Sequence, residues 1–353
     1  MDLARTLERL ASLGAAGFYR GEVAQKLVAG VKAAGGIWSM QDLAQYKVIE
    51  RTPIKGTYRG ATITSAAPPS SGGIALMTML NILSGYELDK LETGQQKHLI
   101  VEAMRRTYHD RARYLGDPDY FEIPVTRLIS TVYAAGLRAG IHPSKATPST
   151  SLVPKLEPRP KGTDTTHYSI VDREGNRVAA TLSVNYPFGS GFMPPGTGVL
   201  LNNEMDDFSA KPGVPNLYGL VGGRANAIAP GKRMLSSMSP TFIENDKRIG
   251  VIGTPGGSRI ITMVLHGILG FVAGEDAATI VSKPRYHHQY LPDEIQFEPG
   301  ALGLEEQRVL QALGHRLQPL DNTYGNMQVV IIEKDGNTTA ASDPRGTGSA
   351  TVQ

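Results

Sequence analysis

The chain has 353 residues, of which 41% are hydrophobic, 20% charged and 7% aromatic, and its 36 basic and 33 acidic side chains give a net charge of +3. This balance, with 40 glycines and 23 prolines, is typical of a turn-rich globular protein and excludes a largely disordered one. Basic and acidic residues are interspersed, so nucleic acid is not predicted as a partner. The chain has no cysteine, which excludes disulfides, thiol catalysis and cysteine-bound zinc.

Neither the start of the chain nor its most apolar stretch predicts contact with a membrane. The first residues, MDLARTLERLASLG, place charged side chains at helical spacing and hold no apolar run long enough for a secretory signal. The stretch 260–274, IITMVLHGILGFVAG, is too short to span a bilayer and contains a histidine. We therefore expect a buried helix there, no membrane span and no export of the chain as written.

The first part of the chain is predicted to be mostly helical, from its periodicity and its start and stop residues. In chain order we expect helices over 3–14 and 21–36, a short helix from a capping box at Ser39, a hairpin over 53–66 that turns at Arg59 and Gly60, and helices over 74–88 and 95–117.

Residues 142–164 differ in composition from the rest of the chain. They hold five prolines and almost no apolar periodicity, which predicts an exposed linker open to cleavage. Segments of this length inside a compact domain are uncommon and often functional. We therefore divide the chain into a helix-rich region, 1–164, and a mixed region, 165–353.

The mixed region begins with strand patterns. TTHYSIVD, the turn REGN and RVAATLSVNY predict a hairpin. Further strand pairs are expected at 240–246 with 248–255 and at 326–337 with 338–343, and helices at 258–274, 275–283 and 303–314.

The hairpin opens with two threonines, and Thr165 is a candidate nucleophile. A threonine hydroxyl needs a base, which the α-amine of an N-terminal threonine can provide because its pKa lies close to neutral. Thr165 would have that amine only after the Asp164–Thr165 bond is broken. Threonine is also a common strand residue, so the triplet TTH alone is more typical of an ordinary strand.

Three other stretches could bind charged groups. In GTPGGSRI, the N–H groups of Gly256 and Gly257 could face an anion or an oxyanion, although an ordinary strand-to-helix turn has the same pattern. In NNEMDD, the amide and carboxylates could hold an ammonium group or a metal, although a solvated turn is the more frequent explanation. Ser236 and Ser237 could bind a carboxylate or lie in a simple loop, and the adjacent His287 and His288 would face opposite ways on a strand, so joint metal ligation is not expected.

Taken together and in order, these stretches resemble the γ-glutamyltranspeptidase family. The motifs are TTHYSIVD, LLNNEMDDFSAKPGVPNLYGLVGG, KRMLSSMSPT, GTPGGSRIITMVL, PRYHHQYLPDE and ASDPR, with ERTPIKGTYRG, GGIALMTMLNIL and YLGDPDYF upstream. The resemblance covers essentially the whole chain.

The resemblance implies an α+β fold, the four-layer αββα sandwich of the N-terminal-nucleophile hydrolases. It implies self-cleavage before Thr165, which would leave 165–353 as a small subunit associated with the large one. It implies γ-glutamyl transfer from glutathione to water or to amino acid and peptide acceptors, with no cofactor and no metal. The roles it assigns are the nucleophile at Thr165, whose motif Thr166 and His167 complete; support of the nucleophile by Ser183; the oxyanion hole at Gly256 and Gly257; substrate binding by Asn185, Glu204, Asp207, Ser236 and Ser237; and a lid gate at Tyr218.

Two departures from the family pattern are visible. Ser183 stands where the resemblance leads us to expect threonine, and its hydroxyl preserves the supporting group. The chain also begins after a signal segment and part of the large subunit that includes a carboxylate-binding arginine, so it is expected to be N-terminally truncated. We therefore expect cleavage chemistry to be retained and glutamyl recognition to be weaker. A periplasmic or extracellular location is implied by the resemblance alone.

Three alternatives stay open at this point. One is an amide hydrolase of the cephalosporin-acylase type, from the same superfamily. Another is a non-catalytic remnant that stays uncut. The third is a metal-dependent hydrolase that uses Asp206, Asp207 and the histidines.

Overall fold

The computed structural model describes residues 1–152, 165–211 and 213–353. Most of the predicted linker, including Asp164, lies outside these ranges. The chain forms two compact units, Met1–Arg51 with Val184–Glu204, and Thr52–Ser183 with Met205–Gln353. These units are divided by compactness, so they do not test the predicted boundary before Thr165, and each is described by itself.

The first unit is a small helical cluster. It comprises α1 (Asp2–Leu13), α2 (Ala16–Tyr19), α3 (Gly21–Ala33) and α4 (Met40–Gln45). The apolar face of α3 forms its core with Leu43 and with the partly buried Val199 and Leu201. The capping box expected at Ser39 is present, because the Ser39 hydroxyl accepts from the Asp42 N–H and the Asp42 carboxylate accepts from the Ser39 N–H.

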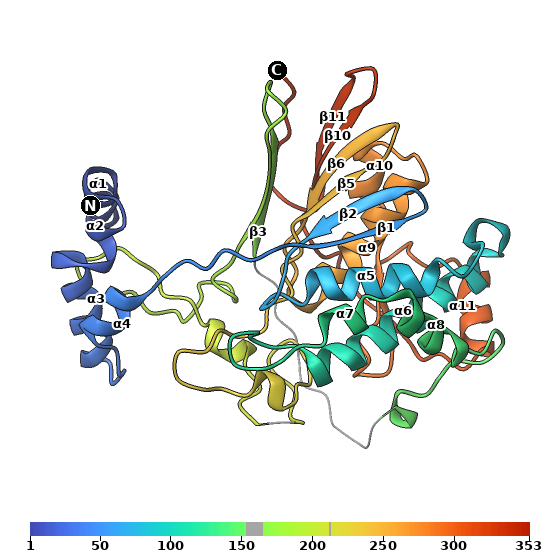
Figure 1. The fold of residues 1–353 in the computed structure, drawn as a ribbon, viewed down its shortest axis with the longest axis horizontal. Helices are drawn as coiled ribbons and strands as arrows, with labels where there is room; N and C mark the ends of the chain where they lie inside the picture. The colour runs from blue at the N-terminus through green and yellow to red at the C-terminus, as the bar shows by residue number, and fades with distance from the viewer. Residues whose placement is uncertain (153–164, 212) are drawn as a thin grey trace. The chain divides into compact units, whose positions relative to one another are not determined.

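The second unit is built on a six-stranded antiparallel sheet (Figure 1). Its strands, in spatial order, are β1 (Ile54–Tyr58), β2 (Ala61–Ser65), β5 (Thr241–Glu244), β6 (Arg248–Gly253), β10 (Gln328–Glu333) and β11 (Thr338–Ser342). The sheet joins the two sequence regions, since β2 pairs with β5 from Thr62 opposite Glu244 to Ser65 opposite Thr241.

Helices cover one face of this sheet. They are α5 (Gly72–Leu83), which packs on β1 and β2, α9 (Ile260–Val272) on β6, and α10 (Ala277–Ser282) on β10 and β11. Every residue of α5 is buried, because α6 (Thr93–Tyr114) packs on its other side. The remaining elements are α7 (Val125–Leu128), α8 (Thr131–Ala139), α11 (Leu304–Ala312) and the small sheet of β7 (Tyr286–His287), β8 (Ile295–Phe297) and β9 (Leu317–Pro319).

The hairpin of β3 (Thr166–Val171) and β4 (Arg177–Leu182) packs on the opposite face, against β6 and β10. Gly253 makes this close approach possible, because a Cβ atom there would lie only 2.1 Å from Cε1 of His167. The second unit therefore shows three layers, helices, sheet and hairpin, with Tyr168, Ile170 and Val178 exposed on the outer face of the hairpin.

The predicted linker is not exposed over its whole length. Ala146 and Ser149 are buried, and their N–H groups donate to the Leu313 carbonyl and to the Asp293 carboxylate. The composition of this stretch predicted exposure. It could not reveal the hydrogen-bond partners that bury these residues, because Leu313 and Asp293 are far away in sequence. In the described residues no helix is long and apolar enough to cross a membrane, and α9 is the buried helix expected at 260–274.

Candidate active site

Thr165 lies directly before β3, and Ser183 lies directly after β4. Because Thr166 pairs with Leu182 in the antiparallel hairpin, the next pair outward brings Thr165 and Ser183 opposite each other. Their hydroxyl oxygens are 3.1 Å apart, within hydrogen-bonding distance. The two residues predicted as nucleophile and support are thus placed in contact.

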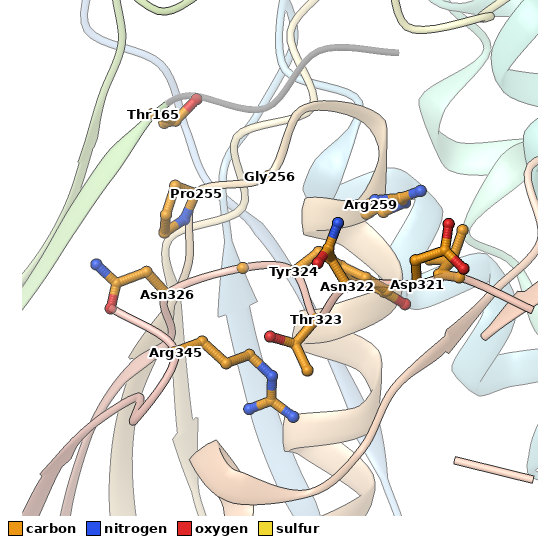
Figure 2. A pocket seen from close by; sticks show the side chains of 12 residues that line it. Thr165, Pro255, Gly256, Arg259, Asp321, Asn322, Thr323, Tyr324, Asn326 and Arg345 are labelled. Atoms are coloured by element: carbon orange, nitrogen blue, oxygen red, sulfur yellow. The ribbon is translucent and has the colours of Figure 1, made fainter. Parts of the chain in front are cut away.

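Thr165 borders a pocket of about 590 Å³ (Figure 2). Pro255 and Gly256 line it beside Thr165, and the segment 320–326 lines the rest together with Arg259 and Arg345. Figure 2 shows Asn322, Thr323 and Asn326 along that segment. Sequence reasoning missed this segment, because LDNTYGN has the composition of any polar turn before a strand.

The two glycines of GTPGGSRI have backbone conformations that suit an anion site. Gly256 has φ 141° and Gly257 has φ 55°, and both values favour glycine. They lead into the short 3₁₀ turn Gly257–Arg259 ahead of α9. Within the described ranges neither N–H donates a backbone hydrogen bond, so both are available to a ligand oxygen.

Tyr218 lies against the second of these glycines. A Cβ atom at Gly257 would lie 2.4 Å from Cε1 of the Tyr218 ring, and the ring is buried. The backbone of Tyr218 is fixed by Asn216, whose Oδ1 accepts from the Tyr218 N–H, and by Gln289, whose amide donates to the Tyr218 carbonyl. The residue predicted as the lid gate thus packs against one of the two glycines predicted to form the oxyanion hole.

The predicted carboxylate-binding serines have their hydroxyl oxygens occupied as acceptors. The Met238 N–H donates to Ser236 Oγ over 3.0 Å, and the Arg111 guanidinium donates to Ser237 Oγ over 3.0 Å. A hydroxyl in that position has its own O–H left to donate. Both serines are therefore polarised toward an anionic group.

Asp207 is held by two amides. The side chain of Asn216 donates to its carboxylate over 3.4 Å, and that of Asn226 donates to its carbonyl over 2.6 Å. Asp207 lines a small cavity together with Arg111 and Asn216. Asp206 is used differently, because its carboxylate accepts from the Leu217 N–H and so fixes the loop that carries Tyr218.

Asn185 and Glu204 belong to the first unit and are described only there. Asn185 is buried with φ 72°, and its amide donates to the Asn203 carbonyl over 3.1 Å. The Glu204 N–H donates to Asn202 Oδ1. Asn185 therefore contacts Asn203, the residue directly before Glu204. The placement of Asn185 and Glu204 against Thr165 stays a prediction.

His167 has a structural environment. Its ring nitrogens lie 2.8 Å from Thr181 Oγ1 and 3.1 Å from Ser169 Oγ. Burial lowers the pKa of His167 to about 4, so the ring is neutral near pH 7. With both nitrogens engaged between hairpin and sheet, it positions the strand that carries Thr165.

Among the described residues, the group suited by distance to hold a metal ion is His98, Glu102 and His315. Arg105 and Arg106 both form ion pairs with Glu102, so its charge is already compensated and the donor set does not favour a cation. Asp206, Asp207, His287 and His288 are not part of this group, and this arrangement gives no support to the metal-dependent alternative.

The comparisons with known proteins agree on the class of this site. The fold matches the crystal structure of cephalosporin acylase from Bacillus halodurans with a TM-score of 0.84 at 26% identity, over 99% of this chain and 61% of that one. The predicted α+β fold of the N-terminal-nucleophile hydrolase type is therefore confirmed.

Residues 1–353 match the γ-glutamyltranspeptidase family, and the chain belongs to that family. It is 49% identical over 319 residues to the glutathione hydrolase proenzyme of Pseudomonas sp. strain A14, covering 89% of this chain and 55% of the relative. It is 44% identical over 356 residues to the glutathione hydrolase proenzyme of Escherichia coli K12, covering 99% and 61%. The chain thus spans a little over half the length of these relatives.

Proposed function

We propose that the chain cuts itself before Thr165 and then acts as a γ-glutamyltransferase and glutathione hydrolase. The observation that carries the proposal is the position of Thr165, with its hydroxyl on Ser183 and its side chain at the edge of a 590 Å³ pocket that also exposes Gly256. Nucleophile, supporting hydroxyl and oxyanion donors are the parts that acyl transfer needs.

The chemistry follows from these parts. After the cut, the α-amine of Thr165 would take the hydroxyl proton while Oγ1 attacks the γ-carbonyl of the substrate. The carbonyl oxygen, now negative, would accept from the N–H groups of Gly256 and Gly257. The proton then passes to the leaving amine, and a γ-glutamyl ester remains on Thr165. Water or an acceptor amine attacks this ester, releases the glutamyl group and restores the hydroxyl.

The two parts of the substrate are assigned to two different sets of residues. Ser236, Ser237 and Asp207 would bind the α-carboxylate and α-ammonium of the glutamyl group, with Asn185 and Glu204 as further ligands. None of these residues lines the pocket at Thr165. That pocket therefore suits the other substituent of the scissile carbonyl, the cysteinylglycine that leaves or the acceptor that enters.

A cut before Thr165 would leave the two pieces joined. Strands β1 and β2 come before it and β5, β6, β10 and β11 after it, within one hydrogen-bonded sheet. The buried Arg105 on α6 also forms an ion pair with Asp293. Separating the pieces would expose these groups, which supports their association as subunits.

Activity on γ-glutamyl compounds is preferred to amide hydrolysis of the cephalosporin-acylase type. Identity is 44–49% to the two glutathione hydrolase proenzymes, 35% to the acylase ACY 1 proenzyme of Pseudomonas sp. strain SE83 and 26% to the cephalosporin acylase. The Asp207 carboxylate suits the ammonium group of an amino acid, and the hydroxyls of Ser236 and Ser237 can donate to its carboxylate. An exported location stays a prediction from the resemblance.

The test is the intact mass of the purified chain after incubation at neutral pH, followed by a glutathione hydrolysis assay. We expect two pieces that sum to the precursor plus one water, with the break before Thr165. Thr165→Ala should abolish the cut, while Thr57→Ala, an exposed strand threonine on β1, should not. A stable uncut chain would refute the proposal and favour the remnant, and a cut chain inactive on glutathione but active on an acyl amide would favour the acylase.

A further inference from the structure

Arg111, on α6, is a buried arginine that forms no ion pair among the described residues. Its side chain is fully packed, with 5% of the residue exposed. Nε donates to Ser71 Oγ over 2.9 Å and Nη2 donates to Ser237 Oγ over 3.0 Å. In the described parts of the chain, no acidic oxygen lies within ion-pair distance of its guanidinium.

This arrangement differs from that of most other buried arginines in the unit. Arg105 and Arg106 are both paired with Glu102, and Arg285 is paired with Asp343. Arg259, which also has no such pair, stacks its guanidinium 4.3 Å from the centre of the Tyr324 ring. The Asp207 carboxylate acts on Arg111 only from beyond ion-pair distance. A buried charge without an ion-pair partner is costly, so a guanidinium in this position behind a candidate binding site points to a further anionic group, that of a ligand.

Arg111 reaches the ligand-binding serines through two short relays. In the first, it donates to Ser237 Oγ, which leaves the Ser237 O–H to donate outward. In the second, it donates to Ser71 Oγ, and Ser71 in turn donates to the Ser236 carbonyl from both its hydroxyl, over 2.7 Å, and its N–H, over 2.8 Å. One guanidinium is thus connected to the hydroxyl of Ser237 and to the backbone of Ser236.

The charges around this cluster separate in the way an amino acid head group requires. Arg111 and Asp207, which carry opposite charges, line the same small cavity of about 10 Å³. A cavity of that size has room for about one water molecule at most, so the ligand itself would lie outside it and meet the serine hydroxyls. The cation behind Ser237 favours a carboxylate there, and Asp207 favours an ammonium group nearby.

We propose that Arg111 is a positioning residue for the α-carboxylate of the γ-glutamyl group: it orients the hydroxyl of Ser237, anchors the backbone of Ser236 through Ser71, and supplies the positive charge behind both residues. This rests on the proposed γ-glutamyl function. It assigns to α6 a part in substrate selection, because a substrate without the α-carboxylate gains nothing from Arg111.

The test compares two anilides that differ only in that carboxylate, γ-glutamyl-p-nitroanilide and 4-aminobutyryl-p-nitroanilide. In Arg111→Gln we expect kcat/KM for the glutamyl compound to fall about 100-fold, mainly through KM, because charge-assisted binding is lost. For the aminobutyryl compound we expect a change of less than about threefold. Arg111→Lys, which keeps the charge and loses the fork, should lie between. Arg113→Gln, an exposed arginine on the same helix, should behave as the unaltered chain.

Each outcome decides the matter. Equal losses on both anilides would show that Arg111 only stabilises the fold, and no loss on either would also overturn the inference. Should Arg111→Gln fail to fold, Ser71→Ala breaks one relay and leaves the cation in place, and it should reduce the preference for the glutamyl compound.

Absence of turnover in the unaltered chain would count against the proposed function rather than against this inference. In that case, calorimetric titration with L-glutamate and with 4-aminobutyrate decides the role of Arg111. We then expect L-glutamate to bind the unaltered chain and to bind Arg111→Gln about 100-fold more weakly. No preference for L-glutamate over 4-aminobutyrate in the unaltered chain would overturn the inference.

Discussion

Gly253 at the end of β6 is the position where one added methyl group should separate the hairpin from the sheet. In Gly253→Ala the new Cβ would lie 2.1 Å from Cε1 of His167 and 2.4 Å from Nδ1. Optimal carbon contacts are about 3.5–4.0 Å apart, so the ring must move by about 1.4 Å. His167 is held by Thr181 and Ser169, and the displacement is therefore passed to the strand that begins after Thr165.

The size of the effect can be worked from these contacts. Overpacking of this kind costs about 1–3 kcal/mol, and a lost hydrogen bond of His167 adds about 1 kcal/mol. We expect the free energy of unfolding to fall by about 2–4 kcal/mol. A shift of about 1 Å in a reacting group can cost about 100-fold in rate, so cleavage before Thr165 should slow by that order.

Urea unfolding and intact mass against time measure the two effects. Gly250→Ala is the matched control, because it lies on the same strand and its Cβ would meet Phe271 of α9, on the helical face, at 2.9 Å. It should lower stability while leaving the cleavage rate within about threefold. The loss of unfolding free energy in the double variant Gly253→Ala/His167→Ala should be smaller than the sum of the losses in the two single variants by about 1–3 kcal/mol. Additive losses, or a Gly253→Ala chain that cuts normally, would refute the reasoning.

Three further predictions concern the hydroxyl pair, the oxyanion turn and the pH dependence of stability. Ser183→Ala should slow cleavage about 5- to 10-fold, the worth of one hydrogen bond to Thr165, whereas Ser183→Thr should not; intact mass against time decides. Gly257→Ala should reduce turnover at least about 100-fold, because its Cβ would lie 2.4 Å from the Tyr218 ring, while Gly274→Ala, with φ 86° and open space around it, should only lower stability by about 1 kcal/mol. The pKa of His167 is lowered to about 4 in the folded chain and is about 6.5 in the unfolded chain. Between these values the unfolded chain binds more protons, so the free energy of unfolding should fall by up to about 3 kcal/mol as the pH drops from about 6.5 to about 4. Urea unfolding of the uncut Thr165→Ala chain at both pH values measures this loss, which His167→Asn should reduce; an unchanged loss would contradict the assignment.

Periodicity and turn residues predicted the elements whose burial is set locally. The hairpin turn at Arg59 and Gly60 has the positive φ values, 46° and 80°, that its sequence indicated. The helices α5 and α9 lie where the apolar runs placed them. Short helices such as α7 and the three-residue strands β8 and β9 were missed, because they depend on neighbours distant in sequence rather than on a pattern of their own.

The candidate site divides in the same way. The pairing of Thr165 with Ser183 follows from a hairpin whose turn could be recognised, so its register was implicit in the sequence. The part played by Arg111 could not be predicted, because Arg111 and Ser237 are 126 residues apart and nothing local marks one arginine among the six in 105–138 as buried without an ion pair. The pocket wall at 320–326 has the same origin, since only the packing of the loop beside Gly256 gives it a role.

Backbone strain also marks this site. Among the residues that the structure describes, four other than glycine have positive φ, and the turn residue Arg59 is explained by its hairpin. Asn185, with φ 72°, follows Ser183 by two residues and is fixed by bonds across to Asn203, whose Oδ1 accepts from the Tyr186 N–H and whose carbonyl accepts from the Asn185 amide. A strained conformation persists only where the surroundings determine it, and a loop held in this way directly after the nucleophile's partner has been built for a fixed position. Within the second unit, Gly256 and Gly257 also have positive φ, so the predicted oxyanion position should depend on a backbone conformation that glycine permits.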